Sequence, residues 1–288
     1  MLFDSHCHVD DDRYDEDREE LINSLPEKGI DLILEIGADM GSSRRAAKLA
    51  ERYPFIYAAV GVHPSDTRNM TEKDIEELAM LSQNPKVKAI GEIGLDYHYE
   101  DTHKPTQQKW FRRQMELAMD LSLPFIIHDR DSHADCLSIL REYDVKKTGG
   151  VMHCFSGSAQ MAKEVIGMGM MISLGGPVTF KNARHAVEVA KEIPLDKILI
   201  ETDSPYLAPE PLRGKRNSPE HVRFVAEKIA DLIKKSVPDY LLGEWRLANN
   251  LASMPILDAV VECLIEKGVL TPPEDGIGAE GCWMSVEK

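Results

Sequence analysis

Eight short runs rich in apolar and β-branched residues recur about every thirty residues through the first 205 positions of the chain. They are LFDSHCHV (2–9), DLILEIGA (31–38), FIYAAVGVHP (55–64), VKAIGEIGL (87–95), PFIIHD (124–129), GGVMHCFSG (149–157), MMISLGG (170–176) and KILIETDSP (197–205). Most are apolar on both faces of an extended strand, which is typical of a parallel sheet covered on both sides. We therefore expect eight buried strands.

Segments with a helical pattern alternate with these strands. They include residues 40–53, 71–83, 106–122 and 182–193, and Ser218 followed by Pro219 predicts the start of a last amphipathic helix. Eight strand-helix units are typical of a (β/α)8 TIM barrel, whose functional groups lie at the C-terminal ends of the strands.

The predicted fold is therefore α/β, a TIM barrel with a C-terminal helical extension. We assign residues 1–236 to the barrel and residues 237–288 to a C-terminal helical segment and tail that packs on the barrel or trails from it. Within the second part, residues 255–268 carry a one-sided apolar pattern and predict a helix.

Composition and charge narrow the classes of protein. No segment approaches the roughly 18 apolar residues of a membrane span, and no signal-like stretch opens the sequence. Five scattered cysteines without a CxxC pair favour reduced thiols, so we expect a cytoplasmic protein with no membrane contact, and we infer no obligate protein partner. A net charge of -15 argues against a protein that coats nucleic acid, so any such contact should be local.

Ionisable residues fall late in six of the eight predicted strands, where a barrel carries its functional groups. They are His6, His8, His63, Glu92, His128, His153 and Asp203. A lone histidine in an apolar strand is more often structural, but this many ionisable groups at one barrel mouth would be costly to bury without counterions. We therefore predict a divalent-metal site with the ligands His6, His8, Glu92, His128, His153 and Asp203.

His6 and His8 share one face of an extended strand, and Cys7 points to the other face. Cys7 is therefore expected to be a buried packing residue and not a ligand.

Six ligands exceed the needs of one tetrahedral site, whereas two ions that share a bridging carboxylate would use them all. Glu92 is the best candidate for the bridge. Imidazole ligands favour ions such as zinc, manganese or iron, and magnesium is a further candidate. Asp203 is expected to bind metal, to accept a proton from bound water, or both, and the alternative is a turn aspartate before Pro205. Glu201, deeper on the same face, is expected to support a ligand.

The segment after the last strand concentrates positive charge in Arg213, Lys215 and Arg216. Barrels commonly bind phosphate there, and the planar guanidinium of Arg213 makes it the strongest candidate, with a solvated surface loop as the alternative. Two interpretations of His63 stay open. In one it donates to a substrate phosphate or orients a ligand, and in the other it has a structural role.

Six stretches resemble the TatD family of metal-dependent deoxyribonucleases in order and spacing, across roughly residues 1–235. They are FDSHCHVD, GVHP, IGEIGLDY, PFIIHDRD, HCFSGS and IETDSPYLAPEPLRGKRNSP. The resemblance implies a TIM barrel of the amidohydrolase superfamily, gives ligand roles to the same six residues, and suggests phosphate contacts near His63 and Arg213. Family members usually close with a helix bearing a T-x-x-N-A-type segment, for which LANNLASM (247–254) is at most a degenerate counterpart.

The leading hypothesis is a deoxyribonuclease that hydrolyses DNA phosphodiesters with a metal-activated water, at ends or in single strands, with Asp203 and Glu92 as catalytic residues. The alternative is a hydrolase of the same superfamily acting on an ester or amide, such as aminoacyl-tRNA. Many amidohydrolases bridge their metals through a modified lysine where this chain has Glu92, and this difference favours phosphoester chemistry. A protein that only binds metal or nucleic acid would show gaps in the ligand set, and the sequence shows none.

Overall fold

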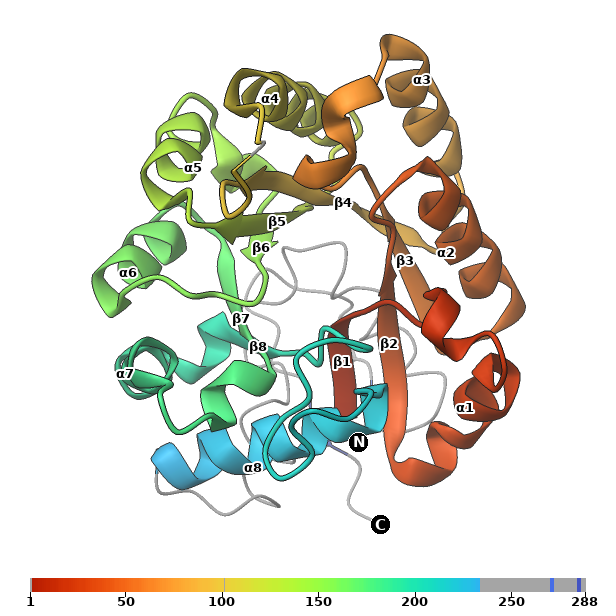
Figure 1. The fold of residues 1–288 in the computed structure, drawn as a ribbon, viewed down its shortest axis with the longest axis vertical. Coiled ribbons are helices and arrows are strands. Elements are labelled where there is room, and N and C mark those ends of the chain that lie inside the picture. The colour runs from red at the N-terminus through yellow and green to blue at the C-terminus, as the bar shows by residue number, and fades with distance from the viewer. Residues whose placement is uncertain (1, 101, 234–269, 272–283, 286–288) are drawn as a thin grey trace.

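A single parallel sheet, seen end-on in Figure 1, organises the molecule. The computed structural model describes residues 2–100, 102–233, 270–271 and 284–285. The strands of the sheet follow one another in sequence order and are β1 (Leu2–Cys7), β2 (Ile30–Ile36), β3 (Ile56–Val60), β4 (Val87–Asp96), β5 (Phe125–Arg130), β6 (Gly150–Met152), β7 (Met171–Leu174) and β8 (Ile198–Ile200). Each strand overlaps its predicted run, so all eight strand predictions are confirmed.

The sheet closes on itself where β1 meets the chain just after β8. A parallel bridge joins Cys7 to Ser204. The Asp203 N–H donates to the His6 carbonyl at 2.9 Å, and the His8 N–H donates to the Ser204 carbonyl at 2.8 Å. The predicted TIM barrel is thereby confirmed, and its seam lies beside three of the predicted ligands.

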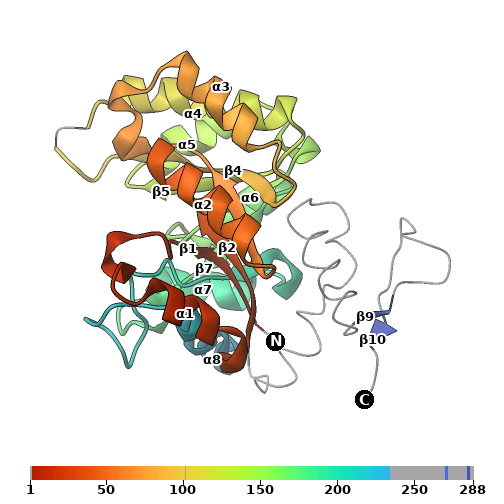
Figure 2. The ribbon, with the colours of Figure 1, turned by 90° about the vertical axis from the view of Figure 1, so that its right-hand side faces the viewer.

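Helices surround the barrel, as Figures 1 and 2 show. They are α1 (Arg18–Ser24), α2 (Met40–Arg52), α3 (Glu72–Leu81), α4 (Lys104–Asp120), α5 (His133–Leu140), α6 (Ala159–Gly167), α7 (Arg184–Glu192) and α8 (Val222–Leu232). The last helix begins later than predicted, because Pro219–His221 form a 3-10 turn and the Ser218 hydroxyl contacts Glu220 in place of a backbone N–H. In the described part of the chain, no helix is long and apolar enough to cross a membrane.

The interior of the barrel is packed with apolar side chains. They are Phe3, Leu34, Ile36, Tyr57, Ala59, Ala89, Ile126, Val151, Met171 and Leu199. Every strand contributes to this cluster and no helix does, whereas a larger cluster packs the strands against the helices. Because side chains alternate along a strand, the residue two positions further on points into the same interior, one layer nearer the mouth.

The C-terminal part of the prediction lies largely outside the described residues. This holds for the helix expected at 255–268, for the segment 247–254, and for the boundary after residue 236, which stays a prediction. The short strands β9 (Leu270–Thr271) and β10 (Met284–Ser285) pair antiparallel with each other.

Candidate metal centre

The predicted ligands lie at the mouth of the barrel, directly above its apolar interior. His128, His153 and Glu201 each lie two residues beyond an interior apolar residue of β5, β6 or β8, and Asp203 lies four beyond. His6, Glu92 and His128 belong to strands, whereas His8, His63, His153 and Asp203 lie one to three residues beyond the ends of theirs. Backbone hydrogen bonds continue at this level, between Asp203 and His6 and between His153 and Ile127, so strand ends and the short segments after them hold the side chains of the site.

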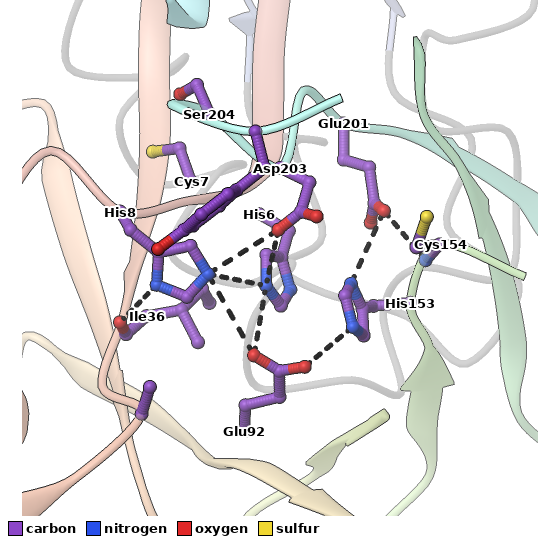
Figure 3. A network of polar contacts seen from close by, with 12 residues as sticks. His6, Cys7, His8, Ile36, Glu92, His153, Cys154, Glu201, Asp203 and Ser204 are labelled. Atoms are coloured by element: carbon purple, nitrogen blue, oxygen red, sulfur yellow. Dashed lines mark hydrogen bonds and ion pairs between the residues drawn. The ribbon is translucent and has the colours of Figure 1, made fainter. Parts of the chain in front are cut away.

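Two pairs of imidazoles lie on either side of Glu92. The Nε2 atoms of His6 and His8 are 3.2 Å apart. In the second pair, His128 Nδ1 and His153 Nε2 are also 3.2 Å apart. Figure 3 shows Glu92 between the first pair and His153.

The Glu92 carboxylate gives one oxygen to each pair. Its Oε2 lies 3.5 Å from His6 Nε2 and 3.9 Å from His8 Nε2. Its Oε1 lies 2.7 Å from both His128 Nδ1 and His153 Nε2. This division is the geometry that a carboxylate bridging two ions requires.

Asp203 joins the first pair. Its Oδ1 lies 3.7 Å from His6 Nε2 and 3.5 Å from His8 Nε2, and these three ligand atoms all fall within 4.8 Å of one another. The Asp203 carbonyl also accepts the Tyr206 N–H at 2.8 Å, so the residue does form a turn while its side chain faces the imidazoles. Its side chain is 15% exposed against 4% for Glu92, which leaves Asp203 as the more solvent-accessible of the two carboxylates.

Three of the four imidazoles have an oxygen beside the ring nitrogen that faces away from the cluster. These contacts are His8 Nδ1 to the Ile36 carbonyl at 2.9 Å, His128 Nε2 to Asp96 Oδ2 at 3.3 Å and His153 Nδ1 to Glu201 Oε1 at 3.4 Å. Such partners fix the orientation of a ligating ring and raise its basicity.

Of these supporting carboxylates, sequence reasoning singled out Glu201 and missed Asp96. Glu201 is fully buried and also accepts the Cys154 N–H at 2.7 Å, as its predicted depth implies. Asp96 lies four residues after Glu92 on β4, so the alternation of side chains along that strand was the available signal.

The charges of the cluster depend on one another. Burial would raise the pKa of Glu92, but the imidazoles around it, His153 foremost, outweigh burial and hold that pKa well below its usual value. Burial would lower the pKa of His8 and His153, but Asp203 raises the pKa of His8 to about 10, and Glu92 raises that of His153 well above its usual value. The ionised carboxylates thus require positive charge beside them, from protonated imidazoles or from cations.

The donor set fits divalent cations. Four imidazoles and at least two carboxylates meet in one buried volume, and imidazole with carboxylate is a ligand combination that transition ions accept. Among the described residues, the buried atoms His6 Nδ1, His128 Nε2, His153 Nδ1 and Glu201 Oε2 make no hydrogen bond. Two of these atoms, His128 Nε2 and His153 Nδ1, lie near carboxylates without the geometry of a hydrogen bond, so it is the chemistry of the donor set that carries the fit to cations.

His63 also lies against the cluster, with Nε2 3.8 Å from Glu92 Oε1. Burial, with the charge of His128 beside it, lowers the pKa of His63 to about 3, so its ring is neutral. Its Nδ1 accepts the Ser65 N–H at 3.1 Å, which assigns the ring proton to Nε2 on the side of the cluster. His63 is therefore placed as a hydrogen-bond donor at the mouth.

Two arginines of the cationic segment after β8, Arg216 and Arg213, have different surroundings. Arg216 donates to the Asp17 carboxylate at 2.8 and 2.5 Å and to the Arg13 carbonyl at 2.7 Å, so its charge is already paired. Arg213 lies over the Phe180 ring, 4.3 Å from its centroid. No contact between Arg213 and the six predicted ligands occurs within the described residues, and its role in phosphate binding stays a prediction.

Cys7 points away from the cluster. It is fully buried in the core between strands and helices, with Sγ 3.5 Å from the Leu34 carbonyl, and this burial raises the pKa of the thiol well above its usual value. The predicted burial is confirmed.

The sequence matches the family model described as TatD related DNase over residues 3–241. The chain belongs to the TatD family. This TatD-family chain is 49% identical over 232 residues to the uncharacterized metal-dependent hydrolase YabD of Bacillus subtilis, a match that covers 81% of the chain and 91% of the relative. It is 34% identical over 236 residues to the 3'-5' ssDNA/RNA exonuclease TatD of Cronobacter turicensis, with 80% and 89% covered.

Solved structures agree with this assignment. The TatD homologue YJJV of Escherichia coli K12 superposes with a TM-score of 0.81 at 30% identity, covering 88% of this chain and 97% of that one. The TatD-family chain is thus a metal-dependent hydrolase of the amidohydrolase superfamily, and the resemblance noted in its sequence is confirmed.

Proposed function

We propose that this TatD-family hydrolase is a divalent-metal-dependent deoxyribonuclease that cleaves phosphodiester bonds at ends or in single strands of DNA. The observation that carries the proposal is the division of the two Glu92 oxygens between two imidazole pairs, since two ions on a shared carboxylate suit in-line displacement at phosphorus. A relative named as a single-stranded DNA and RNA exonuclease supports the choice of bond.

The chain offers two binding positions. His6, His8 and Asp203 would hold one ion, His128 and His153 the other, and Glu92 both. When bound, the ions supply Lewis acidity and lower the pKa of a coordinated water towards neutrality. Zinc, manganese and magnesium are the candidates, and the number of imidazoles favours the first two.

The protein's own groups supply proton transfer and orientation. Burial would raise the pKa of Asp203, but its hydrogen bond with His8 and the nearby imidazole charges outweigh burial and keep it ionised. Because Asp203 is also partly exposed, it can accept a proton from the attacking water and pass it to solvent. The Nε2–H of His63 is directed to donate to a phosphate oxygen, and Arg213 would hold phosphate at the edge of the mouth.

The proposal is tested by removing metal with a chelator and adding back magnesium, manganese or zinc in separate reactions. Each reaction contains labelled single- and double-stranded DNA and RNA together with a panel of carboxylic esters, an aminoacyl-tRNA and amides. We expect metal-dependent cleavage of DNA, fastest on single strands. Hydrolysis confined to the esters or amides would replace the nuclease assignment with another hydrolase activity.

A further inference from the structure

A pocket opens beside His63, between the 3-10 helix Pro64–Asn69, the loop after β4 and the start of α4. Its walls include Pro64, Ser65, Arg68, Tyr99, His103 and Gln107. Figure 2 shows the loop between β4 and α4 projecting on the same side as the loops that follow β1 and β8.

The walls of this pocket contact two residues that border the predicted ligands. The Ser65 N–H donates to His63 Nδ1 at 3.1 Å. Gln107 Oε1 accepts the Asp96 N–H at 2.9 Å, and the Asp96 carboxylate lies 3.3 Å from His128 Nε2. A ligand in the pocket would therefore lie next to a phosphate held at the cluster.

Tyr99 presents an aromatic ring at the edge of this pocket. Its side chain is 54% exposed, and no hydrogen bond of its hydroxyl occurs in the described part of the chain. The ring is steadied by His98, whose imidazole packs edge-on at 5.2 Å and pairs with Asp131 at 2.9 Å. An exposed ring held in this way is a stacking platform for a nucleobase.

A second exposed tyrosine, Tyr206, already has partners for both its hydroxyl and its ring. Tyr206 is 40% exposed and lies 6.3 Å from the His8 ring. Its hydroxyl donates to Asp11 at 2.9 Å, and the Arg13 guanidinium covers its ring at 4.3 Å. The guanidinium nearest to the Tyr99 ring, that of Arg130, lies further off at 5.8 Å, so Tyr99 is the better placed of the two to accept a base.

Two guanidinium groups without acidic partners border Tyr99. Ten of the fourteen arginines in the described residues pair with a carboxylate, and the four that do not are Arg68, Arg130, Arg184 and Arg213. Arg68 lines the pocket, and Arg130, two residues beyond His128, lies 5.8 Å from the centre of the Tyr99 ring. In a chain of net charge -15, cations left unpaired around one exposed ring favour an anionic aromatic ligand.

We propose that Tyr99, Arg68 and Arg130 form a subsite for one nucleotide of a single-stranded substrate, next to the nucleotide whose phosphate lies at the metal centre. This inference rests on the proposed function and adds to it the residues that would recognise an unpaired nucleotide. Tyr99 stacks on the base, and the two guanidinium groups hold the phosphates on either side. Stacking of this kind tolerates any base but needs one that is unpaired, so the subsite selects single strands over duplexes.

The test compares two substrates of the metal-loaded protein: a hexathymidylate, and methyl 4-nitrophenyl phosphate, a diester that carries no nucleobase. We expect Tyr99→Ala to lower the ratio of kcat/KM for the hexanucleotide to that for the small diester about tenfold, mainly through KM. Tyr99→Phe keeps the ring and is expected to retain the ratio, because none of the described residues forms a hydrogen bond with the hydroxyl. An unchanged ratio in Tyr99→Ala would overturn the subsite, as would an equal loss in Tyr99→Phe.

The contribution of the Arg68 guanidinium to substrate binding is tested with a matched control variant. Arg68→Ala should lower the same ratio several-fold, whereas Arg223→Ala, which removes an exposed arginine on α8 paired with Glu227, should leave it unchanged. Equal effects of the two variants would mean that only the overall charge matters, which contradicts a built phosphate contact.

Failure of the proposed function would be distinguishable from failure of the subsite. If no metal supports hydrolysis of either diester, the nuclease assignment fails, and the subsite is decided by fluorescence anisotropy of labelled hexathymidylate on the same metal-loaded protein. A dissociation constant about tenfold higher in Tyr99→Ala than in Tyr99→Phe supports the subsite. Equal constants, or no binding by the unaltered protein, overturn it.

Discussion

Single carboxylates decide the chemistry of this barrel. Glu92 is nearly inaccessible, and each of its oxygens faces a different pair of imidazoles, so its position suits a fixed bridge. Asp203 faces one pair only and keeps access to solvent, so its position suits a group that both binds and exchanges a proton. We therefore expect the two acidic residues to differ in role, because they differ in exposure and in neighbours.

Asp203→Asn is expected to abolish turnover without unfolding the protein. The amide has the size of the carboxylate, but it carries no charge for the ion and accepts no proton, so kcat should fall by at least about 100-fold. Circular dichroism and the thermal midpoint, measured beside activity, should match those of the unaltered protein. An Asp203→Asn enzyme that stays active would show that another group accepts the proton.

Cys7→Ser should leave the metal content intact. The thiol packs on the helix side of β1, with Sγ beside the Leu34 carbonyl and Glu35 Oε2, and a serine hydroxyl can donate to either oxygen, so the free energy of unfolding is expected to fall by no more than about 1 kcal/mol. Metal bound per chain, measured by elemental analysis after dialysis, should equal that of the unaltered protein. Loss of an ion in a folded Cys7→Ser protein would reveal a ligand role.

The predicted cluster could be read from the sequence because its histidines and acids interrupt otherwise apolar strands. His6, His128 and Asp203 stand out in this way. Asp96 did not, since it lies at the end of a strand beside polar loop residues, where an aspartate is unremarkable. Tyr99 and Arg68 likewise lie in connecting segments, whose three-dimensional neighbours depend on how the whole barrel closes.

The pairing of β4 with β5 is the element on which the geometry of the cluster depends. Gly94 lies opposite His128 in this pairing, with a φ of 136°, and a Cβ at this position would lie 2.0 Å from the His128 carbonyl oxygen. Only glycine allows the two backbones to approach this closely. The close approach fixes the distance between Glu92 on one strand and His128 on the other.

Gly94→Ala is therefore expected to lower the free energy of unfolding by at least about 1–3 kcal/mol and to weaken metal binding, because β5 must move to admit the methyl group. Urea unfolding and metal titration measure the two effects. Gly167→Ala is the matched control: this position on α6 has open space around the new methyl group, so stability should stay the same or rise by up to about 1 kcal/mol. A Gly94→Ala protein as stable as this control would contradict the packing argument.

The strands and most helices were predictable because their patterns are local. Apolar residues recur with a period of two in a strand and of about 3.6 in a helix wherever one side of the element packs against the core. The start of α8 was less predictable, since Ser218 and Pro219 suit either a cap or the 3-10 turn that they form. The choice between them depends on contacts with Glu220 and the neighbouring loop, which no local pattern records.

At the level of the molecule, the proposed function requires a chain of net charge -15 to bind a polyanionic substrate. Such a charge would repel nucleic acid at a distance, so attraction would come from the few arginines that have no carboxylate partner among the described residues, such as Arg68. The substrate segment that the protein holds should accordingly be short.

Binding of single-stranded DNA should then depend only weakly on salt. The three proposed guanidinium contacts, from Arg68, Arg130 and Arg213, predict a slope of about -2.1 for the logarithm of the association constant against the logarithm of salt concentration. Arg68→Ala should make this slope shallower by about 0.7. Fluorescence anisotropy in a series of salt concentrations measures both values, and a slope steeper than about -3.5 would indicate an extended basic track instead.

The most direct measurement is a titration of metal into the stripped protein while cleavage of a labelled single-stranded oligonucleotide is followed. Two ions bridged by Glu92 predict no cleavage without metal and full activity at two equivalents per chain, with Glu92→Gln unable to reach it at any loading. Full activity at one equivalent, activity without metal, or a metal-loaded protein that leaves the oligonucleotide intact would contradict a binuclear nuclease.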